Sequence, residues 1–160
     1  MKGLFLEEIE LDRDEILGRH HFTRQAIVHF AQAYDPQPFH LDDEAARQSH
    51  FGGLCASGWH TAAAWMKCYT AFNDRYRLER ASRGEGLPEI GPSPGFQNLK
   101  WLKPVYVGDT ITYHCRTREK RPLRSKPGWG LLQFSTLGRN QKEEAVFSFD
   151  GKVLVQMRGH

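Results

Sequence analysis

An aspartate and a histidine stand five residues apart in the segment DPQPFH, residues 35–40. Its two prolines restrict the backbone, so the segment should hold the Asp35 and His40 side chains at a fixed separation. A carboxylate and an imidazole on either side of one water molecule can remove one proton and deliver another. We therefore take Asp35 and His40 as a candidate acid/base pair. The alternative, which spacing alone favours, is that Asp35 caps a helix end or a turn and His40 is an ordinary histidine.

The step from Ser57 to Gly58 is a second candidate element, because it precedes a long apolar segment that should form a helix. Backbone N–H groups in the first turn of a helix have no partner within the helix and lie at the positive end of its dipole. Such groups can bind a carbonyl oxygen that becomes negative during a reaction. Plain N-capping by Ser57 is the alternative, and it is the more common role of a serine at such a position.

The segments around the candidate pair must position it. A strand is predicted over residues 15–22, and Thr23 can cap a helix that begins near Arg24. Apolar residues recur on one face of that helix, at Ile27, Phe30, Ala31 and Tyr34. The helix should end by Asp35, because a proline follows it. We expect an extended or turning loop over residues 35–40 and a short helix from residue 42 to about 48.

A buried helix is predicted over residues 58–72, because apolar side chains occupy nearly all of its sides. Residues 73–94 are polar, basic and interrupted by Gly and Pro, which predicts a long surface loop or lid. Four strands should follow, over residues 95–102, 110–118, 130–137 and 145–157. These elements predict a single α+β domain over residues 1–160, in which an antiparallel sheet wraps around the buried helix.

The composition is that of an ordinary globular chain, with 39% hydrophobic and 26% charged residues. A net charge of +3 is weak evidence for a nucleic-acid partner. Cys55, Cys68 and Cys115 are far apart and show no zinc-binding spacing, so we expect reduced thiols and no metal site. Because no export signal and no long apolar run are present, we expect no membrane partner and a cytoplasmic protein.

Three segments together match a known pattern. DPQPFH (35–40), followed by GGLCASGWHTA (52–62), resembles the family of MaoC-like dehydratases and (R)-specific enoyl-CoA hydratases, and WLKPVYVGDTI (101–111) resembles a later segment of that family. The resemblance implies a hotdog fold and the reversible hydration of a trans-2-enoyl thioester, with enoyl-CoA as the expected substrate. It assigns the activation of water to Asp35 and His40. It assigns the polarisation of the thioester carbonyl to the N–H of Gly58, beside Ser57.

The resemblance also implies that no cofactor is needed, since the thioester is itself the electron sink, and that the protein works in fatty acid metabolism as a homodimer or higher homo-oligomer. The chain departs from the family at Gln37, where Asn is usual, and at Ser57, where His is common. The densest basic stretch, residues 116–126, could contact the phosphates of CoA, but we favour a solvated hairpin.

Two alternatives to a hydratase stay open. A hotdog thioesterase often uses a carboxylate on or beside the central helix. Residues 57–72 contain no Asp or Glu, although a loop carboxylate such as Asp42 could serve. The other alternative is a non-catalytic hotdog protein that binds acyl thioesters, which the departure at Gln37 permits.

Overall fold

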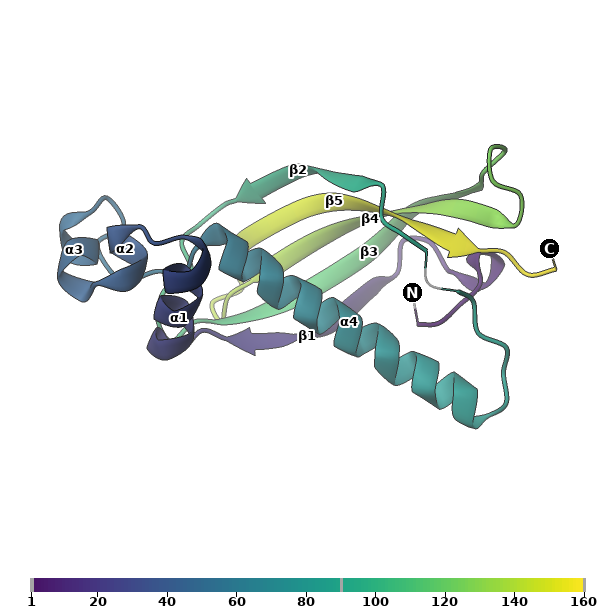
Figure 1. Cartoon of the computed structure of the whole chain (residues 1–160), viewed down its shortest axis with the longest axis horizontal. Helices are drawn as coiled ribbons and strands as arrows, with labels where there is room; N and C mark the ends of the chain where they lie inside the picture. Colours follow the sequence, from purple (N-terminus) through teal and green to yellow (C-terminus); the bar gives the residue numbers. More distant parts are fainter. Residues whose placement is uncertain (1, 90, 160) are drawn as a thin grey trace.

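A computed structural model describes residues 2–89 and 91–159, and it shows one five-stranded antiparallel sheet that wraps along a long helix (Figure 1). The strand order is β1-β3-β4-β5-β2, and every neighbouring pair is antiparallel. The strands are β1 (Asp14–His21), β2 (Gly95–Trp101), β3 (Thr110–Pro122), β4 (Trp129–Arg139) and β5 (Ala145–Gln156). The expected α+β fold, with its sheet around a central helix, is confirmed.

The central helix, α4 (Gly58–Ser82), buries the side that faces the sheet. Its buried residues are His60, Thr61, Ala64, Trp65, Cys68 and Phe72. They pack against the aromatic and aliphatic side chains of the sheet, among which Tyr113 and Phe147 are fully buried. On its other side Trp59 and Met66 are exposed, so the helix is not enclosed all round as its composition predicts.

The prediction of a loop over residues 73–94 is wrong in its first half, because α4 continues to Ser82. Residues 73–82 contain neither Gly nor Pro, and the exposed side chains of this part of α4 are mostly polar, although Leu78 is exposed as well. Tyr76 packs on the Phe72 ring at 5.0 Å between centroids, and Glu79 forms an ion pair with Arg83 at the end of the helix. The chain turns away only at Gly84, whose φ is +70°.

Three short helices gather at the N-terminal end of α4, and a single turn of 3₁₀-helix, η1 (Leu6–Glu8), precedes β1. The helices are α1 (Arg24–Tyr34), α2 (Pro38–Leu41) and α3 (Asp43–Gln48). The predicted cap of α1 is confirmed, since Thr23 Oγ1 accepts the Ala26 N–H at 3.1 Å. The prediction of a loop throughout residues 35–40 is wrong, because Pro38 begins the helical turn that carries His40. Proline suits the first position of a helix, where its missing N–H has no partner to lose.

Among the residues that the structure describes, no helix combines the length and apolar character needed to cross a bilayer.

Candidate active site

Asp35 and His40 lie side by side in the structure. Asp35 is the C-terminal cap of α1, where its N–H donates to the Ala31 carbonyl, and His40 lies in α2. Asp35 Oδ2 is 3.6 Å from His40 Nε2, and both side chains are largely buried. The two prolines between them thus hold a carboxylate oxygen and an imidazole nitrogen close to hydrogen-bond distance.

The other ring nitrogen of His40 fixes its tautomer. Nδ1 lies 2.7 Å from the backbone oxygen of Cys55, and a carbonyl oxygen can only accept a hydrogen bond. Nδ1 therefore carries a proton, and in the neutral ring Nε2 presents a lone pair toward Asp35. That nitrogen is available as a proton acceptor.

The carboxylate of Asp35 receives a donor on each oxygen. The Ser57 hydroxyl donates to Oδ2 at 2.6 Å, and the Gln37 amide donates to Oδ1 at 2.7 Å. Burial alone would raise the pKa of Asp35, but these two hydrogen bonds and the adjacent His40 together hold that pKa below its usual value. Asp35 is therefore an anion across the ordinary working range of pH.

Ser57 serves both the helix and the carboxylate. Its fully buried Oγ accepts the Trp59 N–H at 3.2 Å, which caps α4, while its hydroxyl hydrogen goes to Asp35. The capping role and the site role that the sequence offers as alternatives thus occur together.

Gly58 begins α4 beside the indole of Trp101, the last residue of β2. A Cβ atom at Gly58 would lie 2.3 Å from that indole, so the close packing of Trp101 on the helix start requires a glycine here. Asp35, His40, Gly58 and Trp101 all line one pocket of about 450 Å³. The structure therefore brings the candidate pair and the candidate helix start to one cavity, with Ser57 behind it.

Cys55 lies near the pair but has the wrong protonation state for a nucleophile. Its Sγ is 3.7 Å from His40 Nδ1, and burial raises the pKa of the thiol to about 11. A thiol that keeps its proton is a poor nucleophile at neutral pH.

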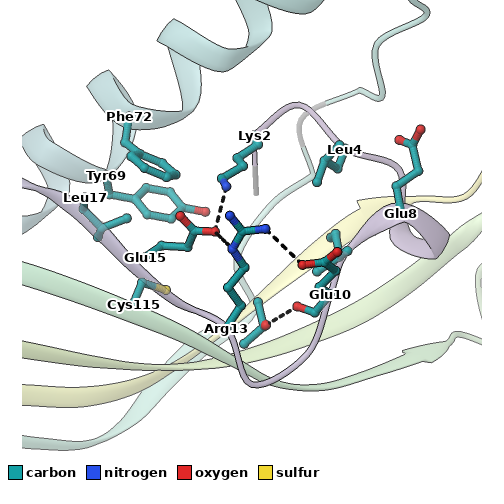
Figure 2. A pocket seen from close by; sticks show the side chains of 12 residues that line it. Lys2, Leu4, Glu8, Glu10, Arg13, Glu15, Leu17, Tyr69, Phe72 and Cys115 are labelled. Carbon is teal, nitrogen blue, oxygen red and sulfur yellow. Dashed lines mark hydrogen bonds and ion pairs between the residues drawn. The ribbon is translucent and has the colours of Figure 1, made fainter.

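A second hollow, of about 180 Å³, lies beside the middle of α4 (Figure 2). Residues 2–15, the N-terminal segment, line its other side. Its charged side chains pair with one another: Glu15 bonds Lys2 at 2.7 Å and Arg13 at 3.1 Å, and Arg13 also bonds Glu10 at 3.0 Å. This hollow holds ion pairs that fasten the N-terminal segment, and we assign it no catalytic role.

The basic stretch at residues 116–126 also serves the N-terminal segment. Arg116 bonds Asp14 at 2.7 Å, and Arg118 bonds Asp12 at 3.3 Å. Lys120 donates to three backbone carbonyls, those of Leu6, Glu7 and Ile9. Three of the six cations in this stretch are therefore engaged away from the 450 Å³ pocket. In the described part of the chain, no group of three or more His, Cys, Asp or Glu residues could hold a metal ion.

His60 links α1 to α4 in a way that the sequence does not reveal. Its ring stacks on Phe30 of α1, with centroids 4.6 Å apart and an interplanar angle of 5°, and it also contacts Phe22. Its buried Nδ1 has no hydrogen-bond partner among residues 2–89 and 91–159. Burial, with a smaller effect of His20, lowers the pKa of His60 to about 4.

This depressed pKa should make folding stability fall in mild acid. In the unfolded chain a histidine binds its proton near pH 6.5, whereas folded His60 stays neutral until about pH 4. The stability that neutral His60 contributes is thus complete above about pH 6.5 and is lost as the pH falls toward 4. Melting temperatures of the wild type and of His60→Phe, which keeps a ring on Phe30, should be measured from pH 8 to pH 4.5. We expect the melting temperature of His60→Phe to fall less than that of the wild type as the pH falls. Parallel curves for the two proteins would show that His60 does not cause the loss of stability in acid.

Comparisons with known proteins identify the family and the fold. A family model described as "MaoC like domain" matches residues 13–128. The uncharacterized protein YdeM of Bacillus subtilis is 30% identical, over 84% of this chain and 86% of its own. A 3-hydroxybutyryl-CoA dehydratase of Methylorubrum extorquens is 28% identical, over 79% of this chain and 71% of its own. The crystal structure of a MaoC-like dehydratase from Rhodospirillum rubrum is 36% identical and covers 98% of this chain and 99% of its own, with a TM-score of 0.81.

Proposed function

Because this chain belongs to the family of MaoC-like domains and has the hotdog fold, we propose that it hydrates trans-2-enoyl thioesters reversibly to 3-hydroxyacyl thioesters, with enoyl-CoA as the substrate. The family supports enoyl-CoA hydration in general, and the relative named a 3-hydroxybutyryl-CoA dehydratase supports the same chemistry written in reverse, the removal of water from a 3-hydroxyacyl-CoA. The observation that carries the proposal is the 3.6 Å approach of Asp35 Oδ2 to His40 Nε2 beside Gly58 in one pocket.

In the proposed mechanism, one water molecule lies between the pair. Ionised Asp35 and the lone pair of His40 Nε2 are both acceptors, so the water donates one hydrogen to each and turns its oxygen lone pair toward the substrate. As that oxygen bonds to C3, His40 Nε2 takes a proton from the water. Asp35 stays ionised and stabilises the imidazolium, because its carboxylate already holds two donors.

The electron pair of the double bond moves through C2 onto the thioester oxygen as the C3–O bond forms. In our proposal that oxygen lies against the N–H of Gly58, at the positive end of the 25-residue helix α4. The proton on His40 then passes to C2 and the carbonyl re-forms. The net reaction is the addition of one water molecule across the double bond. The reaction uses no cofactor, since the thioester accepts the electrons.

We also propose that the protein works as a homodimer. Five exposed apolar side chains from α4, from β2 and from the residue after β2 lie near one another and form one face: Trp59, Met66, Phe96, Trp101 and Leu102. The strand β2 ends the sheet order, so its outer edge can receive the same strand of a second copy. Such pairing would bury the apolar face and enclose the neighbouring pocket.

The dimer proposal predicts that Phe96→Asp converts the protein to a monomer. Phe96 is 59% exposed on this face, and burial of an unpaired carboxylate in the dimer interface would cost more free energy than the contact provides. Light scattering after size exclusion measures the mass directly. The matched control is Ile16→Asp, since Ile16 is 56% exposed on β1, the opposite edge strand. The idea fails if the wild type is itself monomeric, or if both variants change the mass alike.

The thioesterase alternative has less support from the site. Asp42, the loop carboxylate that could serve it, is engaged as the cap of α3, where Oδ1 accepts the Ala45 N–H at 2.8 Å. The Cys55 thiol keeps its proton. Neither group offers a free nucleophile or base beside the pocket.

The testing experiment mixes the purified protein with trans-2-enoyl-CoA esters of increasing chain length and follows the conjugated enoyl absorbance and free thiol together. Loss of absorbance without thiol release would support hydration and reveal the preferred acyl length. Thiol release would instead support a thioesterase. If the panel shows binding by calorimetry but no turnover, the non-catalytic alternative takes the place of the hydratase.

A further inference from the structure

We propose that Gln37 is a positioning residue for the reaction, because its side-chain amide holds one oxygen of Asp35 and thereby aims the other at His40. The inference rests on the proposed function for its consequence, but the contacts that carry it belong to the chain itself.

The carboxylate of Asp35 cannot fix its own orientation. The torsion that turns an aspartate carboxylate is broad, so its plane is set by the hydrogen bonds that it receives. Ser57 holds Oδ2 at 2.6 Å, but a single contact leaves the group free to pivot about that oxygen. The 2.7 Å bond from Gln37 Nε2 to Oδ1 adds a second, separate contact. Two donors on two oxygens define the plane in which Oδ2 faces His40 Nε2 at 3.6 Å.

The backbone of Gln37 is tied to the same two residues. Its N–H donates to the Asp35 carbonyl at 2.8 Å, and its carbonyl accepts the His40 N–H at 3.0 Å. Gln37 has an extended conformation, with φ −81° and ψ 142°, and is followed by the proline that opens α2. One residue therefore bridges the pair through its main chain and reaches back to the carboxylate through its side chain.

The length of the side chain matters to this contact. Asparagine is shorter by one methylene, about 1.5 Å of reach, so it could not make the same bond from the same backbone. Glutamate has the same length but brings a negative charge to Oδ1 in place of a donor. Gln37→Asn and Gln37→Glu therefore test the reach and the donor separately, and Gln37→Ala removes both.

The experiment records kcat and KM for enoyl-CoA hydration against pH in the wild type and these three variants. Gln37→Ala and Gln37→Asn should lower kcat about tenfold with little change in KM, as expected for the loss of one hydrogen bond to a charged group. The part of the acid limb that reports protonation of Asp35 should move to higher pH, because the ionised carboxylate loses a donor. Gln37→Glu should move it furthest. The matched control is Gln48→Ala, which removes an amide-to-carboxylate bond to Glu44 on α3. It should change neither kcat nor the acid limb of the pH profile.

A second readout needs no substrate. Carboxyl carbon NMR of Asp35 should show its titration at higher pH in Gln37→Ala than in the wild type, and unchanged in Gln48→Ala. An unmoved Asp35 titration in Gln37→Ala overturns the inference, whether or not the protein is active. A shifted titration in a protein that hydrates no enoyl-CoA would support the contact and refute the proposed function instead. A lowered melting temperature with an unmoved titration and acid limb would assign Gln37 a structural role only, which also overturns it.

Discussion

Asp35→Asn should lower kcat for enoyl-CoA hydration by about a thousandfold, within the range usual for the loss of a positioned acid/base group. The amide preserves the size of the side chain, and its oxygen can still accept the Ser57 hydroxyl hydrogen. It removes the negative charge, so the imidazolium that forms when His40 takes a proton loses its counter-ion at 3.6 Å. The fold should persist, so the loss belongs in kcat and not in the amount of folded protein.

His40→Ala should be similarly slow, and the double variant should be no slower than about the slower single variant, because the two groups act on one water molecule as a unit. Steady-state kinetics with a circular dichroism melt for each variant makes the measurement. Asp43→Asn is the matched control, since Asp43 is exposed and pairs with Arg24 outside the pocket. Full activity in Asp35→Asn would show that the reaction does not need the Asp35 carboxylate.

Phe22→Ala should destabilise the fold by about 3–5 kcal/mol, the usual cost of truncating a buried aromatic side chain. Phe22 is 0% exposed and lies between the end of β1 and the start of α1. Its ring meets His20 at 4.7 Å and His60 at 4.9 Å, so its loss opens a cavity where α1 docks on α4. That docking also sets the position of Asp35.

Urea unfolding at neutral pH measures the cost, with Leu78→Ala as control. Leu78 is 71% exposed on the distal part of α4, and its truncation should change the free energy of unfolding by less than about 0.5 kcal/mol. A cost below about 1 kcal/mol for Phe22→Ala would show that the cavity collapses without consequence for the packing of α1.

Local patterns in the sequence predict much of this fold. The cap at Thr23, the burial of Ile27 and Ala31 in α1, and the strands are signals that act over a few residues, and the structure confirms them. The predicted apolar stripe of α1 is wrong at its end, because Tyr34 is 75% exposed. The error over residues 73–82 has the opposite cause, because a polar composition indicates exposure but does not distinguish an exposed helix from a loop. The sequence does not reveal the single helical turn at Pro38, because proline both ends helices and begins them.

The candidate site can likewise be predicted from the sequence only in part. Asp35 and His40 can be singled out from sequence because they are five residues apart in a stiff segment, and Gly58 because it begins a long apolar helix; resemblance to a family then assigns each of them a role. The Ser57 contact with Asp35 spans 22 residues, and the Cys55 contact with His40 spans 15. Both depend on how α1 and α2 dock against the start of α4, which no local pattern in one sequence encodes. The reach of Gln37 to Asp35 is local, but it needs side-chain geometry to be recognised.

The double use of Ser57 has a consequence for inactivation. Helix ends open more readily than helix centres, and such local opening takes less free energy than global unfolding. Since one Ser57 oxygen closes the first turn of α4 and also supplies the donor to Asp35, fraying of that turn and release of the carboxylate are a single event. On gradual heating, activity should therefore decline while the sheet is still intact, and on cooling it should return without refolding of the whole chain.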